Sequence, residues 1–161
     1  MAPHFIMRKY VKIKAILIAS ILSISSAHAT YNAPSSQKDL ESLAQALYFE
    51  ANGETDNGMI AVGEVILNRV SHPKYWKDTI YEVIHEKAQF SYLTQFKDHS
   101  IRSYAKRKRA YRIATKLITG DFTPVVGKHA YFYYNPKYAK PVWRNYPYIG
   151  EVGNHRFLGI K

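Results

Sequence analysis

The sequence predicts an α+β fold, because helical patterning fills its middle and short β-prone runs follow near its end. Apolar residues recur three and four positions apart in several segments between residues 40 and 119. Beyond Pro124 the pattern changes to brief aromatic and β-branched runs that are separated by turn residues. We therefore expect a mainly helical single domain with a small C-terminal β region.

The first helix is expected to begin at Lys38 or Asp39, with Ser35 and Ser36 as candidate N-terminal caps. Its predicted apolar face consists of residues at helical spacing: Leu40, Leu43, Ala44, Leu47, Tyr48 and Ala51. The pair Asn52-Gly53 favours a turn, so the helix is expected to end there.

The second helix is predicted to start at Asp56, as its N-terminal cap, and to end at the break His72-Pro73. Its high density of apolar residues indicates a central position in the core. A short third helix is expected over residues 79–86. The segment Gln89-Phe90-Ser91 is expected to open a loop or a strand.

An amphipathic helix is predicted over residues 103–119, with Gly120 where a C-terminal cap glycine belongs. The basic run at residues 106–109 would form the solvent face of this helix. Short strands are then expected over residues 129–134, 148–153 and 155–158, with a turn at Asn135-Pro136.

Residues 1–29 have the organisation of a secretory signal peptide. Four basic residues precede an apolar run at residues 15–24, and an A-x-A pattern ends at Ala29. The run is shorter than the roughly 20 residues of a membrane-spanning helix. We expect cleavage after Ala29, a flexible leader over residues 30–37, a catalytic domain over residues 38–161, and export to the periplasm, cell wall or extracellular space. An uncleaved membrane anchor is the alternative.

The chain is basic, and it stays basic after cleavage. Its formal charge of +11 falls to +7 because four basic residues leave with the signal peptide and no acidic residue does. Such a charge favours polyanions as partners, and export argues against nucleic acid. The chain has no cysteine, so burial rather than disulfides must hold a domain of about 130 residues. Its fourteen tyrosines provide rings that stack well on sugars, or that simply fill a core with few leucines.

Glu50 is the main candidate for acid chemistry. It ends an aromatic and aliphatic helix, directly after Tyr48-Phe49, and its neighbours should exclude water from one side of the carboxyl group. Partial burial raises a carboxyl pKa, and a protonated glutamate is the general acid that glycosidic bond cleavage requires. From the pattern alone, an ordinary helix-terminal glutamate remains an alternative.

Ordinary glycosidases use a second carboxylate, roughly 5 to 9 Å from the first. Glu54, Asp56 and Glu64 are the nearby candidates, and none is convincing. Glu54 follows the predicted helix break at Asn52-Gly53, so its distance from Glu50 is not defined. Glu64 lies within the apolar second helix, where it is either buried and paired or turned outward.

Several motifs together carry a resemblance. The stretch ALYFEANGE at residues 46–54 is followed by AVGEVILNRV at 61–70, Gln89-Phe90-Ser91 and YFYYNP at 131–136. Trp143, His155 and Phe157 then follow in order. This series, which covers roughly residues 38–157, resembles the SleB/CwlJ cell-wall hydrolase family.

The resemblance implies a lysozyme-like fold and an enzyme that degrades peptidoglycan. Members are described as lytic transglycosylases, which cut between muramic acid and glucosamine with a single glutamate, and by position that residue is Glu50. No metal or other cofactor is expected. The remaining site residues implied by the resemblance are Gln89, Ser91, Tyr134, Asn135 and Trp143 for substrate binding, with Glu54, Tyr131 and His155 in support. Core packing is the alternative role for Tyr131, Phe132 and Trp143. Asn68 and Arg69 are expected to be structural, with Arg69 paired to an acid.

Two other functions remain open from the sequence. A zinc-dependent amidase would cut the peptide stem, with His129, His155 and either Glu50 or Asp121 as metal ligands. A non-catalytic module would bind wall polymer, anionic lipid or nucleic acid through the basic residues 106–112. For the peptidoglycan-degrading enzyme, the expected partner is peptidoglycan and not nucleic acid. Membrane contact is then limited to an uncleaved signal segment, and the protein is expected to be a monomer.

Overall fold

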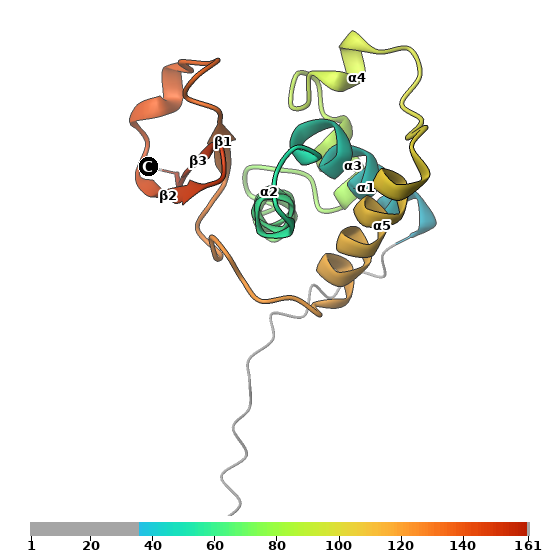
Figure 1. Cartoon of the computed structure of the whole chain (residues 1–161). Coiled ribbons are helices and arrows are strands. Elements are labelled where there is room, and N and C mark those ends of the chain that lie inside the picture. Colours follow the sequence, from blue (N-terminus) through green and yellow to red (C-terminus); the bar gives the residue numbers. More distant parts are fainter. Residues whose placement is uncertain (1–35, 161) are drawn as a thin grey trace, which may run out of the picture.

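The computed structural model describes residues 36–160, so the predicted signal peptide lies outside the described residues. Figure 1 shows a helical part on one side, a small sheet on the other, and helix α2 between them. The helices are α1 (Gln37–Ala51), α2 (Asp56–Val70), α3 (Ile80–His85), α4 (Tyr92–Gln95), α5 (Tyr104–Thr119) and the 3-10 turn η1 (Val142–Asn145). The strands are β1 (Phe132–Tyr134), β2 (Tyr148–Val152) and β3 (His155–Leu158).

Side-chain caps fix where the helices begin. Ser36 and Asp39 form a reciprocal capping box at the start of α1, which satisfies backbone N–H groups that have no partner within the helix. Thr79 and Ser103 cap α3 and α5 through their hydroxyl groups alone, which accept the backbone N–H groups of Glu82 and Lys106. The prediction of Asp56 as the cap of α2 is wrong by one residue. Thr55 is the cap, because its hydroxyl accepts the Gly58 N–H.

Two arginines in the middle of α5 bind the turn between α1 and α2. Arg109 donates to Asp56 Oδ1 at 2.7 Å and to the backbone oxygen of Glu54 at 2.8 Å. Arg112 donates to Asp56 Oδ2 at 2.7 Å. The expectation that the whole basic run faces solvent is therefore wrong for Arg109, which is half-buried, although Lys108 is exposed as predicted.

The predicted boundaries hold best for α5 and for the C-terminal hairpin. Helix α5 ends at Gly120, whose φ of 74° is the left-handed conformation of a cap glycine. The sheet is antiparallel in the order β1-β3-β2, and β2 turns into β3 through Gly153. Of the strand expected over residues 129–134, only the last three residues pair with β3. The single-turn elements α4 and η1 were not expected, because four residues are too few to show a period.

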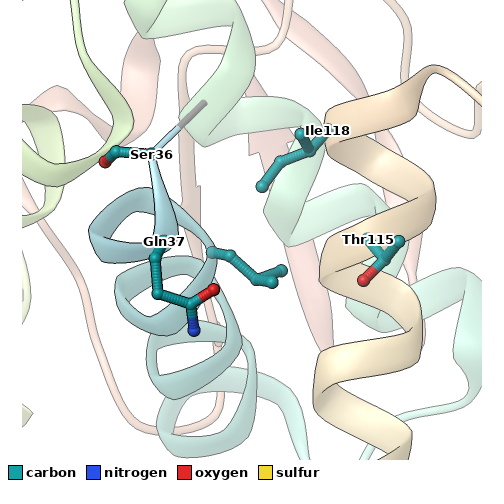
Figure 2. Close-up of a pocket in the computed structure, with 5 residues that line it drawn as sticks. Ser36, Gln37, Thr115 and Ile118 are labelled. Atoms are coloured by element: carbon teal, nitrogen blue, oxygen red, sulfur yellow. The ribbon is translucent and has the colours of Figure 1, made fainter. Parts of the chain in front are cut away.

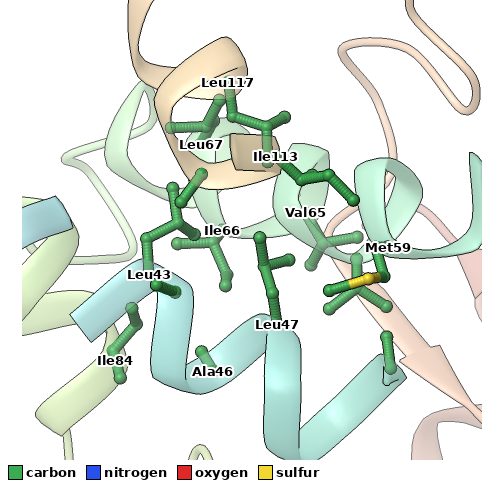
Figure 3. Packing of buried hydrophobic residues seen from close by; sticks show 14 of the residues in the cluster. Leu43, Ala46, Leu47, Met59, Val65, Ile66, Leu67, Ile84, Ile113 and Leu117 are labelled. Atoms are coloured by element: carbon green, nitrogen blue, oxygen red, sulfur yellow. The ribbon is translucent and has the colours of Figure 1, made fainter. Parts of the chain in front are cut away.

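The core lies where α2 meets the other long helices. Figure 3 shows Leu43 and Leu47 of α1 facing Ile66 of α2 and Leu117 of α5. All four side chains are fully buried, and burial of each stabilises the fold by roughly 2 kcal/mol. The central position predicted for the second helix is confirmed, because α2 touches both the helices and the sheet.

Close packing of α2 on α5 depends on Gly63. A Cβ atom at this position would clash with the buried Leu117 side chain. We expect Gly63→Ala to lower the free energy of unfolding by about 1–2 kcal/mol, because overpacking outweighs the better helix propensity of alanine. Urea unfolding measures this. Gly53→Ala is the control, since nothing lies within 4 Å of a Cβ there. Equal stability of both variants would contradict this view of the interface.

A small hollow separates the start of α1 from the end of α5, as Figure 2 shows. Its volume is about 110 Å³, and it is lined by Ser36, Gln37, Leu40, Thr115 and Ile118. Ligand pockets are usually roughly 300–1,000 Å³, so this hollow is too small for a sugar chain. Among residues 36–160, no helix has both the length and the apolar character to cross a membrane.

Candidate active site

Glu50 lies in the last turn of α1, where aromatic rings surround it. The neighbouring Phe49 ring stacks on Tyr92 of α4 with 4.7 Å between centroids. From β1, the Tyr133 hydroxyl donates to Glu50 Oε2 at 3.2 Å. Burial raises the pKa of the Glu50 carboxyl, and the hydrogen bond from Tyr133 offsets part of that rise. Glu50 therefore keeps its proton to a higher pH than an exposed glutamate.

Glu50 opens into a pocket with a volume of about 330 Å³. Its lining comes from α1, α2, the loop before α4, β1 and η1, and consists of Glu50, Arg69, Ala88, Gln89, Ser91, Phe132, Tyr133 and Trp143. Of the residues that the sequence singled out, Glu50, Gln89, Ser91 and Trp143 are thus brought together. Among these lining residues, Glu50 is the only carboxylic acid.

Arg69 of α2 is among the residues that line the pocket. Its guanidinium donates from Nε to the backbone oxygen of Tyr131 at 2.9 Å and from Nη1 to Gln89 Oε1 at 3.1 Å. Burial lowers the pKa of the Arg69 guanidinium and the charge of Glu86 opposes this, so an acid does interact with Arg69, although its hydrogen bonds go to a backbone carbonyl and an amide oxygen. The bond from Arg69 occupies the amide oxygen of Gln89, so this pocket residue has its Nε2 group left to donate.

The loop that carries Gln89 is strained. Ala88 lines the pocket with a φ of 63°, in the left-handed region that a residue with a Cβ adopts at a cost of about 1–2 kcal/mol. Such strain persists where the surroundings over-determine it, and here Arg69 holds the next residue. The loop is therefore fixed in a shape that aims Gln89 at Glu50's pocket.

Two aromatic rings, those of Phe132 and Trp143, form one wall of the pocket. Trp143 packs on Phe132 with 5.1 Å between ring centroids, and Tyr134 meets Trp143 edge-on at 5.7 Å. Tyr134 is 8% exposed and packs against Trp143, but it is not part of the pocket lining. Asn135 also lies outside the lining, where its Oδ1 accepts the Lys137 N–H in the turn after β1.

The three residues predicted to play supporting roles, Glu54, Tyr131 and His155, are not part of the described pocket lining. Glu54 accepts the Asn154 side chain at 2.8 Å and backbone N–H at 3.2 Å, and lies 3.9 Å from His155 Nδ1. Tyr131 stacks on Trp76 at 5.1 Å, and its backbone oxygen holds Arg69. These residues connect the turn after α1 and the helix α2 to the sheet.

The other acids considered as a second carboxylate are also occupied. Glu64 is buried and accepts the backbone N–H groups of Val125, Val126 and Gly127 at 2.8, 2.9 and 3.2 Å. Asp56 pairs with two arginines. Of the two positions that the sequence left open for Glu64, buried and paired or turned outward, the structure shows the first, with backbone N–H groups as its partners.

The ligand set of the amidase alternative is not assembled in residues 36–160, where no group of three or more His, Asp or Glu side chains is placed to hold a metal ion. The residues that sequence reasoning missed are Tyr133 and, as a pocket residue, Arg69. Tyr133 belongs to four consecutive aromatic residues, a run in which strand alternation does not reveal which ring faces Glu50.

Known proteins share this architecture. The family described as Cell Wall Hydrolase matches residues 53–158. The spore cortex-lytic enzyme of Bacillus subtilis is 33% identical over 76% of this chain and 38% of that protein, and the enzyme of Halalkalibacterium halodurans is 35% identical over 76% and 35%. The chain thus spans little more than a third of the length of these relatives.

Solved structures cover the fold more fully. The catalytic domain of the germination-specific lytic transglycosylase SleB from Bacillus anthracis matches with a TM-score of 0.65 and 30% identity, over 78% of this chain and 97% of that one. The catalytic domain of Bacillus cereus SleB gives 0.61 and 30%, over 77% and 91%. The expected mainly helical, lysozyme-like fold with a small C-terminal β region is confirmed. The chain belongs to the Cell Wall Hydrolase family.

Proposed function

We propose that this domain cuts the glycan strand of peptidoglycan between muramic acid and glucosamine, as a lytic transglycosylase with Glu50 as its one acid and base. The observation that carries the proposal is the isolation of Glu50. It is the only carboxylic acid in the described lining of the pocket, and burial raises its pKa. The solved relative from Bacillus anthracis, 97% of which aligns with 78% of this chain, is a lytic transglycosylase.

A single carboxyl group suffices for this chemistry. Protonated Glu50 gives its proton to the bridging glycosidic oxygen, and the bond from that oxygen to the muramic acid carbon C1 breaks. The carboxylate then takes the proton from the same sugar's C6 hydroxyl, whose oxygen bonds to C1 and closes an anhydro ring. Glu50 regains its proton, and no water is consumed. The first step needs the acid form, so activity falls as pH rises through the raised pKa of Glu50.

The other lining residues would hold the sugar. Gln89 offers amide donors to a carbonyl oxygen, such as that of an acetamido group, because Arg69 already occupies its oxygen. Ser91 adds a hydroxyl, and Trp143 offers a ring face for stacking. Asn135, which the sequence predicts as substrate-binding, is proposed to contact the sugar from the turn after β1. Tyr134, also predicted as substrate-binding, is proposed to act through Trp143, against which its buried ring packs.

Export of the protein also remains a proposal. The basic and apolar segment at residues 1–29 supports a cleaved signal peptide. The leader predicted over residues 30–37 would end before Ser36, because Ser36 caps α1 and Gln37 is its first residue. A peptidoglycan-degrading enzyme acts outside the cytoplasmic membrane, so we place the mature protein in the periplasm or the cell wall. It is proposed to work there as a monomer that binds peptidoglycan and not nucleic acid.

Digestion of purified peptidoglycan, with and without a chelator, tests the proposal. We expect soluble fragments with anhydro-muramic acid ends, in equal yield in the presence of EDTA, as judged by mass spectrometry. New reducing ends would indicate a hydrolytic lysozyme. Intact glycan with freed stem peptides, lost on chelation, would overturn the proposal in favour of an amidase. Salt-sensitive binding with no cleavage would favour a wall-binding module.

A further inference from the structure

Tyr133 binds one oxygen of Glu50 and leaves the other without a contact of this kind. The tyrosine hydroxyl lies 3.2 Å from Oε2, and no hydrogen bond to Oε1 is present among the described residues. The two oxygens of the proposed acid are therefore unequal before any substrate binds. A protonated carboxyl group has one hydroxyl oxygen and one carbonyl oxygen, and the carbonyl oxygen is the better acceptor for a donor such as Tyr133.

The ring of Tyr133 packs against a residue of the neighbouring strand β3. His155 of β3 packs against it edge-on, with 5.3 Å between centroids and an interplanar angle of 88°. His155 is in turn placed 3.9 Å from Glu54, which holds Asn154 in the hairpin turn. This series runs from the turn after α1 to the β2-β3 hairpin, so it fixes the hydroxyl of Tyr133 relative to the helix that carries Glu50.

We propose that Tyr133 is a positioning residue that binds Oε2 of Glu50 and thereby assigns the transferable proton to Oε1, the oxygen that faces the glycan. This inference rests on the proposed function. In the first step the proton leaves Oε1 for the bridging oxygen, and the bond from that oxygen to C1 breaks. Tyr133 keeps donating to Oε2 of the carboxylate that remains. In the second step Oε1 takes back a proton from the C6 hydroxyl as its oxygen bonds to C1.

The other ionisable groups around Glu50 are placed differently. Tyr92 of α4 presents a hydroxyl that is buried and has no hydrogen-bond partner in the described part of the chain. Arg69 of α2 donates hydrogen bonds to the Tyr131 backbone oxygen and to Gln89 Oε1. His155 of β3 lies behind Tyr133, and burial lowers its pKa, which favours the neutral ring. Tyr133 is thus the group in direct contact with the carboxyl.

Loss of the Tyr133 hydroxyl has a signature that a purely structural change lacks. A hydrogen bond to a carboxylate favours the charged form, so its removal raises the pKa of the carboxyl. In Tyr133→Phe we expect the alkaline limb of the profile of kcat/KM against pH to move to higher pH. The plateau should also fall by about tenfold, because the proton is no longer confined to one oxygen. KM should change little.

Tyr92→Phe is the matched control, since it removes a hydroxyl near the same carboxyl that makes no hydrogen bond. The alkaline limb of kcat/KM against pH for Tyr92→Phe should coincide with that of the unsubstituted protein. An unmoved limb in Tyr133→Phe, or an equal shift in Tyr92→Phe, would overturn the positioning role while leaving the proposed function intact. Thermal unfolding and circular dichroism of Tyr133→Phe separate a folding defect from a change in proton placement. If Glu50→Gln still formed anhydro ends, both the proposed function and this inference would fail.

Discussion

Glu50→Gln is expected to lower the rate of glycan cleavage by roughly 1,000-fold, which is the scale of general acid and base catalysis. The amide cannot donate a carboxyl proton or take one back, so both steps of the proposed reaction lose their catalyst. The side chain keeps its shape and an oxygen for Tyr133, so the fold should be unaffected. Release of soluble muropeptides, with circular dichroism as the check on folding, measures the effect.

Glu54→Gln is the matched control for this prediction. It also removes a carboxylate close in sequence to Glu50, but its oxygens already serve Asn154, and Glu54 is not part of the described pocket lining. An amide oxygen can retain part of that contact, so we expect a far smaller loss of rate. Comparable losses in the two variants would contradict a mechanism with one acid and would favour a pair of carboxylates.

Glu64→Leu is expected to lower the free energy of unfolding by about 3 kcal/mol, the largest effect on stability that we predict. The change leaves the backbone N–H groups of Val125, Val126 and Gly127 without their acceptor. That loop is only half-buried, so water should replace part of what is lost. Glu64→Gln keeps one oxygen and should cost less.

Urea unfolding of both Glu64 variants measures these differences, with Glu41→Leu on the exposed face of α1 as the control. Because the loop leads from α5 to β1, the leucine variant should also lose activity, since it no longer fixes the position of Tyr133. A stable and fully active Glu64→Leu protein would contradict the role given to this buried carboxylate.

The helices are the part of the fold that the sequence predicts best. Apolar spacing and local caps define α1, α2 and α5, because both signals arise from residues close together in the chain. Element α4 gave no such signal, since its four residues have no side-chain cap. The strand β1 proved shorter than its β-prone sequence, because pairing with β3 and not propensity sets its length.

In the candidate site, too, features set by neighbouring residues can be predicted from the sequence, and contacts between distant residues cannot. The position of Glu50 at a helix end beside aromatic rings can be predicted, because the relevant neighbours Tyr48 and Phe49 are adjacent in sequence. Its bond to Tyr133 joins residues 83 positions apart, and that of Arg69 to the Tyr131 backbone spans 62. Contacts at such separations depend on how the chain crosses from α5 to the sheet, which no local pattern specifies.

The central claim is that Glu50 works with an internal hydroxyl of the sugar and not with water. It is tested most directly by the source of the oxygen that becomes bonded to C1 at the new sugar end. Peptidoglycan is digested in water enriched in the heavy oxygen isotope, and the released ends are analysed by mass spectrometry. We predict anhydro ends that carry no heavy oxygen, because the C6 oxygen closes the ring. Reducing ends labelled with heavy oxygen would contradict this mechanism and would require a group that activates water.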